Sequence, residues 1–200
     1  MKIDPESRSL QGMSSFLGFV ALNLMYLAAC IPVVTIPAAT SALYEVTIRY
    51  SDDESGRPVK DFFPAFGRSF VRATVLGLFL AVPMLLLAAS AVFWASHPSL
   101  LAGAATVIAT LAAVYLFAAF LFAMALTAAF TTPLRQALKN ALLLPAAEPV
   151  RTFGILLIPI ALVCITIVFP MFGVVLVTIG FSIGAYATAF LFRSVFARRG

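Results

Sequence analysis

The stretch that decides the fold is residues 152–192, which read TFGILLIPIALVCITIVFPMFGVVLVTIGFSIGAYATAFLF. None of these residues is Asp, Glu, Lys, Arg or His. A hydrocarbon slab about 30 Å thick takes roughly 20 apolar helical residues to cross, so the stretch is long enough for two crossings. Between Arg72 and Arg135, His97 is the only residue of those five types. The sequence therefore predicts a multi-pass membrane protein.

The composition favours the same class. Hydrophobic residues make up 62% of the chain, charged residues 10%, and the mean hydropathy is +1.07. Soluble proteins carry about 25% charged residues. The net charge of +5 comes from short basic segments that flank apolar ones. A nucleic-acid reader needs a basic patch on a water-exposed domain, so we expect no nucleic-acid binding.

The other apolar segments predict an all-α fold, a polytopic bundle of transmembrane helices that forms one membrane domain over residues 1–200. We expect five spans, at residues 14–31, 73–94, 100–127, 153–169 and 174–192. Two polar segments, residues 51–72 and 131–152, interrupt this pattern. We expect both on the cytoplasmic side, each with an amphipathic helix at the membrane interface.

Two prolines break the first apolar segment. Pro32 and Pro37 are close together, and proline lacks a backbone donor and clashes with the preceding helical turn. A weaker helix, about residues 38–50, follows. Its Glu45 and Arg49 share one face at i, i+4 spacing, and deep in lipid each would cost about 2.5 to 3.5 kcal/mol. We therefore expect this helix at the interface or against other helices, with a sixth crossing as the alternative.

The first polar segment combines aromatic and basic side chains. Phe62, Phe66 and Phe70 fall on one helical stripe, with Arg68 and Arg72 beside it. This pattern suits a helix at the headgroup level of an anionic leaflet. The alternative is that the same phenylalanines pack against the protein's own helices.

The second polar segment also predicts an amphipathic helix. Leu134 and Leu138 lie on one helical face, opposite Arg135 and Lys139. Pro145 is expected to end the helix. This segment thus predicts a second cytoplasmic helix at the interface.

The basic residues predict the orientation. With five crossings, Lys2 and Arg8 lie on one side of the membrane and every other Lys and Arg lies on the opposite side. Cytoplasmic loops carry the excess of these residues, so the richer side, with the C-terminus, is expected to be cytoplasmic. Six crossings would place all 13 in the cytoplasm. Glu45 and Arg49 disfavour that version, and we adopt five spans.

Few side chains inside the spans could carry chemistry. Asn23 is the one strongly polar side chain centred in the first span, and we interpret it as an interhelical hydrogen-bonding residue. Gly180 and Gly184 form a GxxxG pair for packing, within the bundle or in a homo-oligomer. A hydrolase would need a nucleophile with a histidine, or paired aspartates, at membrane depth. We find neither arrangement and expect no enzyme, no cofactor and no metal site.

Several motifs together point to a known family. They are Asn23-Leu24, Cys30-Ile31-Pro32-Val33-Val34-Thr35-Ile36, Ala42-Leu43-Tyr44, Asp53-Glu54 with Gly56, Asp61-Phe62-Phe63 with Ala65-Phe66 and Phe70, and Gln136-Ala137-Leu138-Lys139-Asn140-Ala141. In these motifs the chain resembles the YesL-like bacterial membrane proteins, a family of unknown molecular function. Pro37 and Glu45 depart from that family's pattern. The resemblance implies a bacterial cytoplasmic membrane and, because such proteins are often encoded beside sugar ABC importers, an accessory role in carbohydrate uptake.

Three functional hypotheses follow. The first is a non-enzymatic protein that binds a partner, namely the permease of an ABC-type sugar importer. The alternative is a small transporter or channel for a neutral or amphiphilic solute, with a pathway at Asn23, Pro32, Thr35 and Pro37. The third is an interface with anionic lipid or a partner formed by Phe62, Phe66, Phe70, Arg68, Arg72, Arg135 and Lys139.

Overall fold

Helices form the architecture of the chain, described here from a computed structural model over residues 5–52 and 58–198. In chain order they are α1 (Pro5–Cys30), η1 (Val33–Thr35), α2 (Ile36–Asp52), α3 (Pro58–Ala95), α4 (Leu100–Ala129), α5 (Leu134–Ala147), α6 (Pro149–Val168), α7 (Phe172–Val175), the π-helix η2 (Leu176–Gly180) and α8 (Phe181–Phe196). The described part of the chain contains no strand.

Five helical stretches are long and apolar enough to cross a membrane. They are Gly12–Cys30, Pro58–Ala95, Leu100–Ala129, Pro149–Val168 and Phe172–Phe196. Each contains most of one predicted span, and the all-α polytopic bundle is therefore confirmed. The protein is an integral membrane protein whose apolar helices contact the lipid bilayer.

α2 is the buried centre of this bundle. It contacts α1, α3, α4 and α8, and most of its residues from Pro37 to Tyr50 are buried. Glu45 and Arg49 lie toward its C-terminal end, where the two side chains pair at 2.7 Å. The helix therefore lies against other helices, which is one of the two positions expected from the sequence. Its charged pair thereby avoids the free-energy cost of facing lipid.

α3 differs from the expected arrangement. Residues 58–95 form one continuous helix, in place of an interfacial helix followed by a separate span. Pro64 and Pro83 both lie inside it. Its 38 residues correspond to about 57 Å at 1.5 Å per residue, nearly twice the thickness of the hydrocarbon slab. The helix continues because the sequence offers no turn signal between the polar half and the apolar half.

Pro145 was also expected to end a helix, and it does not. α5 continues past it to Ala147, and Glu148 lies between α5 and α6. Pro149 is the first residue of α6, a position where the missing backbone donor costs nothing. The motif residues Asp53, Glu54 and Gly56 lie outside the described residues.

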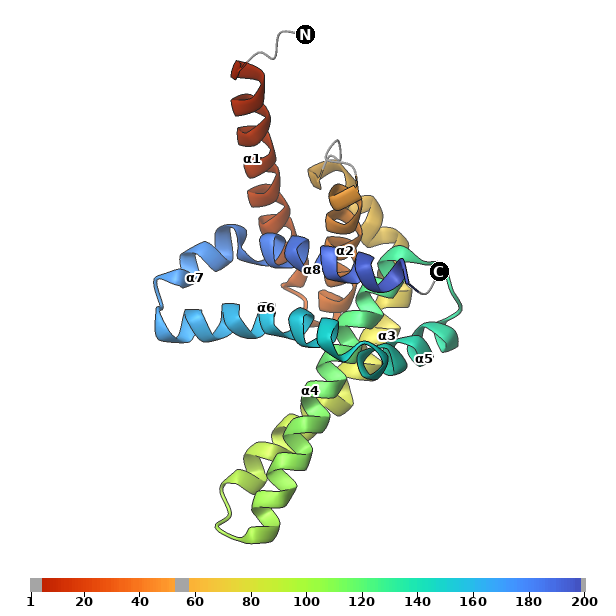
Figure 1. Ribbon diagram of the computed structural model, residues 1–200, viewed down its shortest axis with the longest axis vertical. Coiled ribbons are helices and arrows are strands. Elements are labelled where there is room, and N and C mark those ends of the chain that lie inside the picture. The colour runs from red at the N-terminus through yellow and green to blue at the C-terminus, as the bar shows by residue number, and fades with distance from the viewer. Residues whose placement is uncertain (1–4, 53–57, 199–200) are drawn as a thin grey trace.

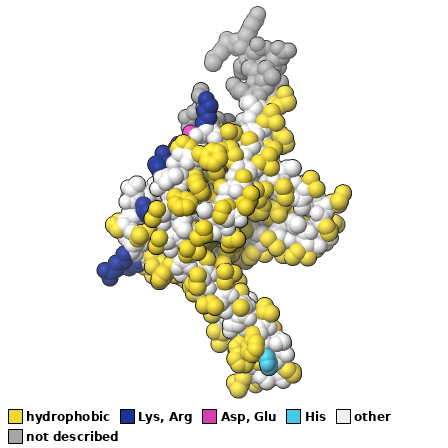
Figure 2. Space-filling model, turned by 180° about the vertical axis from the view of Figure 1, so that it is seen from behind, with side chains coloured by type: hydrophobic (Ala, Val, Ile, Leu, Met, Phe, Trp, Pro, Cys, Tyr) yellow, Lys and Arg dark blue, Asp and Glu magenta, His cyan; other side chains and the backbone are white. Residues whose placement is uncertain are grey.

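The apolar halves of α3 and α4 form a hairpin that projects from the rest of the molecule (Figure 1). Ser99 caps the start of α4, since its side chain accepts the backbone N–H of Ala102 at 3.1 Å. Figure 2 shows this hairpin covered with hydrophobic side chains, while the Lys and Arg side chains visible on the same face lie over the other part of the molecule. The hairpin and the visible Lys and Arg side chains thus lie in different parts of the molecule.

α6 and the stretch α7–η2–α8 form a second antiparallel pair, which extends across the direction of α3 and α4 (Figure 1). The C-terminal half of α8 returns to the centre of the molecule. There Phe192 is fully buried, with its ring centroid 5.2 Å from that of Tyr44 and 5.3 Å from that of Phe122. Aromatic contacts of this kind join α8 to α2 and α4.

Candidate functional site

The proline break between α1 and α2 is held by one threonine. Thr35 Oγ1 donates to the carbonyl oxygens of Ala29 at 2.5 Å and Pro32 at 2.6 Å. Ala29 belongs to the last turn of α1, where carbonyl groups lack partners in the helix. Pro32 lies in the break itself, and its carbonyl oxygen also accepts the backbone N–H of Thr35 at 2.9 Å. Pro32 is exposed, whereas Pro37 is buried at the start of α2. The break is therefore a capped turn.

Pro37 packs directly on a glycine of α3. A Cβ atom added at Gly77 would overlap the ring of Pro37 and lie 3.4 Å from the ring of Phe120. Only glycine leaves room for this approach, which explains why α2 and α3 can lie so close together at this level. Pro37 is thus a packing residue between two helices.

Asn23 connects α1 to the C-terminal span. Its side chain is fully buried, and Nδ2 donates to the carbonyl oxygens of Leu176 at 3.2 Å and Val177 at 2.5 Å. Its Oδ1 accepts the backbone N–H of Ser182 at 3.0 Å, while Ser182 Oγ donates to the carbonyl oxygen of Phe19 at 2.9 Å. The amide is an interhelical hydrogen-bonding group, as interpreted from the sequence.

The partner of Asn23 is the π-helix η2, which the sequence pattern did not reveal. A π turn holds one more residue than an α turn, and such turns are frequent at functional sites. The amide of Asn23 lies between the carbonyl of Val177 and the amide of Ser182, two groups five residues apart. A polar side chain from α1 therefore completes the backbone hydrogen bonding of an irregular turn in α7–η2–α8.

The two glycines of the GxxxG pair serve different contacts. A Cβ added at Gly184 would lie 3.0 Å from Cδ1 of Leu162 and 3.6 Å from Cγ2 of Ile158, both on α6. A Cβ added at Gly180 would lie 2.8 Å from Cδ1 of Leu176, within the same π turn. Gly184 thus allows α8 to pack closely on α6, whereas Gly180 accommodates a side chain of its own helix.

The aromatic stripe of α3 turns inward. Phe62 is fully buried, Phe66 is partly buried, and Phe70 remains 36% exposed. Neighbouring rings of the stripe contact each other, with centroids 6.3 Å and 5.4 Å apart. Of the two alternatives, packing against the protein's own helices therefore holds for Phe62, which belongs to the hydrophobic core.

The four basic residues predicted at the interface fall into two groups. Arg135 and Lys139 are exposed on α5. Arg68 and Arg72 instead lie near the C-terminal end of α4, in a pocket that also includes Arg49 of α2. No sequence pattern connects the Glu45–Arg49 pair with the arginines of α3, because only the tertiary structure brings α2 and α3 together.

A largely apolar cavity of about 320 Å³ lies between α1, α2 and α4 on one side and α6 and α8 on the other. Hydroxyl groups reach its lining from Tyr26, Thr40, Tyr44 and Thr188, and Ile36, the first residue of α2, also lines it. The hydroxyls of Tyr26 and Thr40 lie 3.4 Å apart. None of the described residues in this lining is Asp, Glu, Lys, Arg or His, so the cavity suits a neutral molecule.

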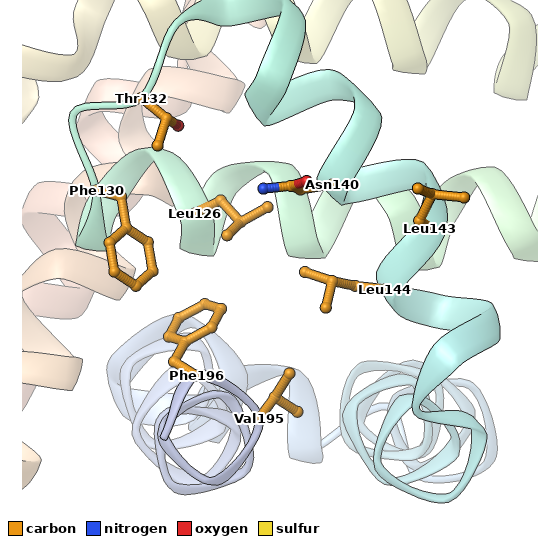
Figure 3. A pocket seen from close by; sticks show the side chains of 8 residues that line it. All are labelled: Leu126, Phe130, Thr132, Asn140, Leu143, Leu144, Val195 and Phe196. Atoms are coloured by element: carbon orange, nitrogen blue, oxygen red, sulfur yellow. The ribbon is translucent and has the colours of Figure 1, made fainter. Parts of the chain in front are cut away.

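A groove of about 360 Å³ lies between the end of α4, α5 and the end of α8 (Figure 3). Its lining comprises Leu126, Phe130, Thr132, Asn140, Leu143, Leu144, Val195 and Phe196. The rings of Phe130 and Phe196 contact each other, with centroids 5.2 Å apart. Figure 3 shows the Asn140 amide directed toward Leu126 across the groove. The site is thus an apolar surface that presents one amide.

These features define an integral membrane protein with an apolar groove, a neutral cavity and an arginine pocket. Residues 19–91 match the model of a family described as "Protein of unknown function, DUF624", so the predicted resemblance to an uncharacterised family is confirmed. The matched segment runs from α1 through the proline break and α2 into α3. No curated protein and no solved structure matches the chain.

Proposed function

We propose that this chain is a non-enzymatic accessory protein of the bacterial cytoplasmic membrane that binds the permease of an ABC-type sugar importer. The resemblance to YesL-like proteins is the basis for the bacterial cytoplasmic membrane and for the link with carbohydrate uptake. The observation that carries the proposal is the groove of Figure 3. Its aliphatic and aromatic lining suits recognition of another apolar segment, and it offers no nucleophile paired with a base.

The groove fits a helix or loop of a partner protein. Covering apolar surface contributes about 25 cal/mol per Å² removed from water. Leu143 is 56% exposed and provides part of that surface. The amide of Asn140 can pair with a peptide group of the partner, which would fix its register along the groove.

The position of the groove favours a cytoplasmic partner surface. α5, which forms one wall, carries Arg135 and Lys139, and α8, which forms another, ends near Arg193. Because cytoplasmic loops carry the excess of Lys and Arg, we place the groove and the C-terminus on the cytoplasmic side. A permease loop exposed to the cytoplasm is therefore the preferred occupant.

Affinity purification of the tagged full-length protein from native membranes tests this proposal. The native chain is expected to recover importer subunits, and Leu143→Gln is expected to reduce recovery. Leu134→Gln is the matched control, because Leu134 lies on the same helix, is 42% exposed and does not line the groove. Failure to recover any importer subunit, together with normal sugar uptake in a deletion strain, would refute the proposal. The molecular mass of the purified complex also reports whether the protein forms a homo-oligomer.

The cavity between α1, α2, α4, α6 and α8 favours a second function, transport of a neutral or amphiphilic solute. Asn23 and Thr35 do not line this cavity. The lining residues nearest to the proline break are Ile36 and Thr40, both in the first turns of α2. We therefore place the pathway of this candidate at the hydroxyl groups, in place of the Asn23 amide.

Cysteine accessibility tests the transport candidate. In a background without Cys30 and Cys164, Thr188→Cys is expected to react with a membrane-impermeant maleimide in intact bilayers if solute reaches the cavity from water. Ser96→Cys, in the exposed turn of the hairpin, is the positive control. Labelling of the control without labelling at position 188 would remove the candidate.

A further inference from the structure

Three arginines converge where the charge-free part of the chain begins. A pocket of about 250 Å³ lies between α2, α3 and the end of α4, and its charged lining consists of Glu45, Arg49, Arg68 and Arg72. Arg72 is the last basic residue before the apolar half of α3. Such a boundary corresponds to the headgroup level of a bilayer, where basic pockets between helices bind anionic headgroups.

The arginines outnumber the carboxylates that reach them. Oε1 of Glu45 accepts from both Arg49, at 2.7 Å, and Arg68. The carboxylate of Asp61 lies 3.9 Å from Arg49, beyond hydrogen-bond distance. Within the described ranges, no carboxylate pairs with Arg72. The four lining side chains therefore carry a net positive charge, and Asp61 reduces it without cancelling it.

Arg72 also removes the main electrostatic objection to an anion at this place. The C-terminal end of a helix carries partial negative charge on its free carbonyl groups, which repels anions. Arg72 donates to the carbonyl oxygen of Phe130 at 3.1 Å and to that of Thr132, just beyond the end of α4. A guanidinium thus covers the helix end on the side of the pocket.

Donor groups remain available after these internal bonds. An arginine offers five N–H donors in a planar fork, and the side chains of Arg49 and Arg68 are 51% and 60% exposed. The Nε of Arg72 has no hydrogen-bond partner among the described residues but is buried, so Arg72 contributes positive charge and the exposed forks of Arg49 and Arg68 supply the donors. Planar forks match the oxygens of phosphate better than a lysine ammonium does.

We propose that this pocket binds a phosphate group through Arg49 and Arg68, with Arg72 supplying further positive charge. The phosphate comes either from the headgroup of an anionic lipid or from a soluble phosphate ester, and both sources share this recognition chemistry. Glu45 competes for the same guanidinium groups and keeps them oriented toward one another when the pocket is free. The pocket adjoins the groove of Figure 3 and shares Phe130 with it, but none of its charged side chains lines the groove, so the proposal does not depend on the proposed permease partner.

Lipid binding to the purified full-length protein tests the pocket. Native mass spectrometry with phosphatidylglycerol and phosphatidylcholine is expected to show preferential retention of phosphatidylglycerol. The double variant Arg49→Gln/Arg68→Gln should lower that retention about tenfold or more, because each arginine makes charge-assisted hydrogen bonds. The matched double variant Arg135→Gln/Lys139→Gln removes the same charge from exposed positions on α5 and should change it less than about twofold.

A variant with the opposite expected effect keeps the test valid if the double variant folds poorly. Glu45→Gln removes the competing carboxylate and should strengthen phosphatidylglycerol binding. Protection of the native protein against thermal unfolding by glycerol 3-phosphate or inorganic phosphate, without lipid preference, would assign the pocket to a soluble source. Equal losses in the two double variants, weaker binding in Glu45→Gln, or no response to any probe would overturn the proposal.

Discussion

Replacing Asn23 by leucine tests the link between the first and last spans. The side chain is fully buried and supplies three hydrogen bonds to the backbone of η2 and α8. Leucine has a similar size and can make none of them. In membrane proteins such a bond contributes about 0.6 kcal/mol on average and about 1.7 kcal/mol at most, so we expect Asn23→Leu to lower the free energy of unfolding by about 2 to 5 kcal/mol.

The freed backbone groups cannot easily pair again within their own helix. If the π turn of Leu176–Gly180 became an α turn, its extra residue would have to be taken up by the rest of the helix. The register of α8 would then shift by one residue, which corresponds to a rotation of about 100°. Phe192, which is fully buried between Tyr44 and Phe122, would then leave the core. The register of α8 therefore resists the repair, and the loss should appear in full.

Circular dichroism during denaturant titration in micelles measures this effect, and hydrogen exchange at residues 176–182 localises it. Thr178→Val is the control, because Thr178 lies in the same turn, is exposed, and donates only to carbonyls of its own helical stretch. The control should change stability by less than about 0.5 kcal/mol. If Asn23→Leu unfolds at the control's midpoint and exchanges at the native rate, the assigned role of the amide is refuted.

Three further predictions concern contacts between helices. Gly77→Ala should lower the free energy of unfolding by about 1 to 3 kcal/mol, since its Cβ would overlap the ring of Pro37. Gly103→Ala is the control: its Cβ meets open space, so it should raise the free energy of unfolding by up to about 1 kcal/mol. Equal thermal midpoints of the two variants would contradict the close approach of α2 to α3. Thr35→Val should cost about 1 kcal/mol and speed proteolysis at the break, because the Ala29 carbonyl at the end of α1 loses the hydroxyl donor, while the Pro32 carbonyl keeps only the backbone N–H of Thr35. A cost no larger than that of Thr110→Val, which loses one exposed intrahelical bond, would argue against a capping role. Arg193→Gln should cost less than about 1 kcal/mol because its ion pair with the end of α2 is partly exposed; a difference from the native chain that persists in high salt would exclude an ionic origin.

The amino-acid sequence was sufficient for the class of fold and for the number of apolar spans. Long uncharged stretches must form helices in lipid, because no water is present there to satisfy backbone groups. The same local logic located the proline break and the amphipathic helix of α5. It also identified Asn23 as an interhelical group, since an amide surrounded by apolar residues needs a partner.

Only the tertiary structure decided which partners these residues meet. The π turn opposite Asn23, the overlap of Pro37 with Gly77, and the meeting of Arg49 with Arg68 all join segments distant in the chain. Periodicity reports which face of a helix is apolar, but it contains no information on the neighbour that covers that face. For this reason the inward position of Phe62 and the composition of each cavity followed from packing, whereas the membrane class followed from the chain itself.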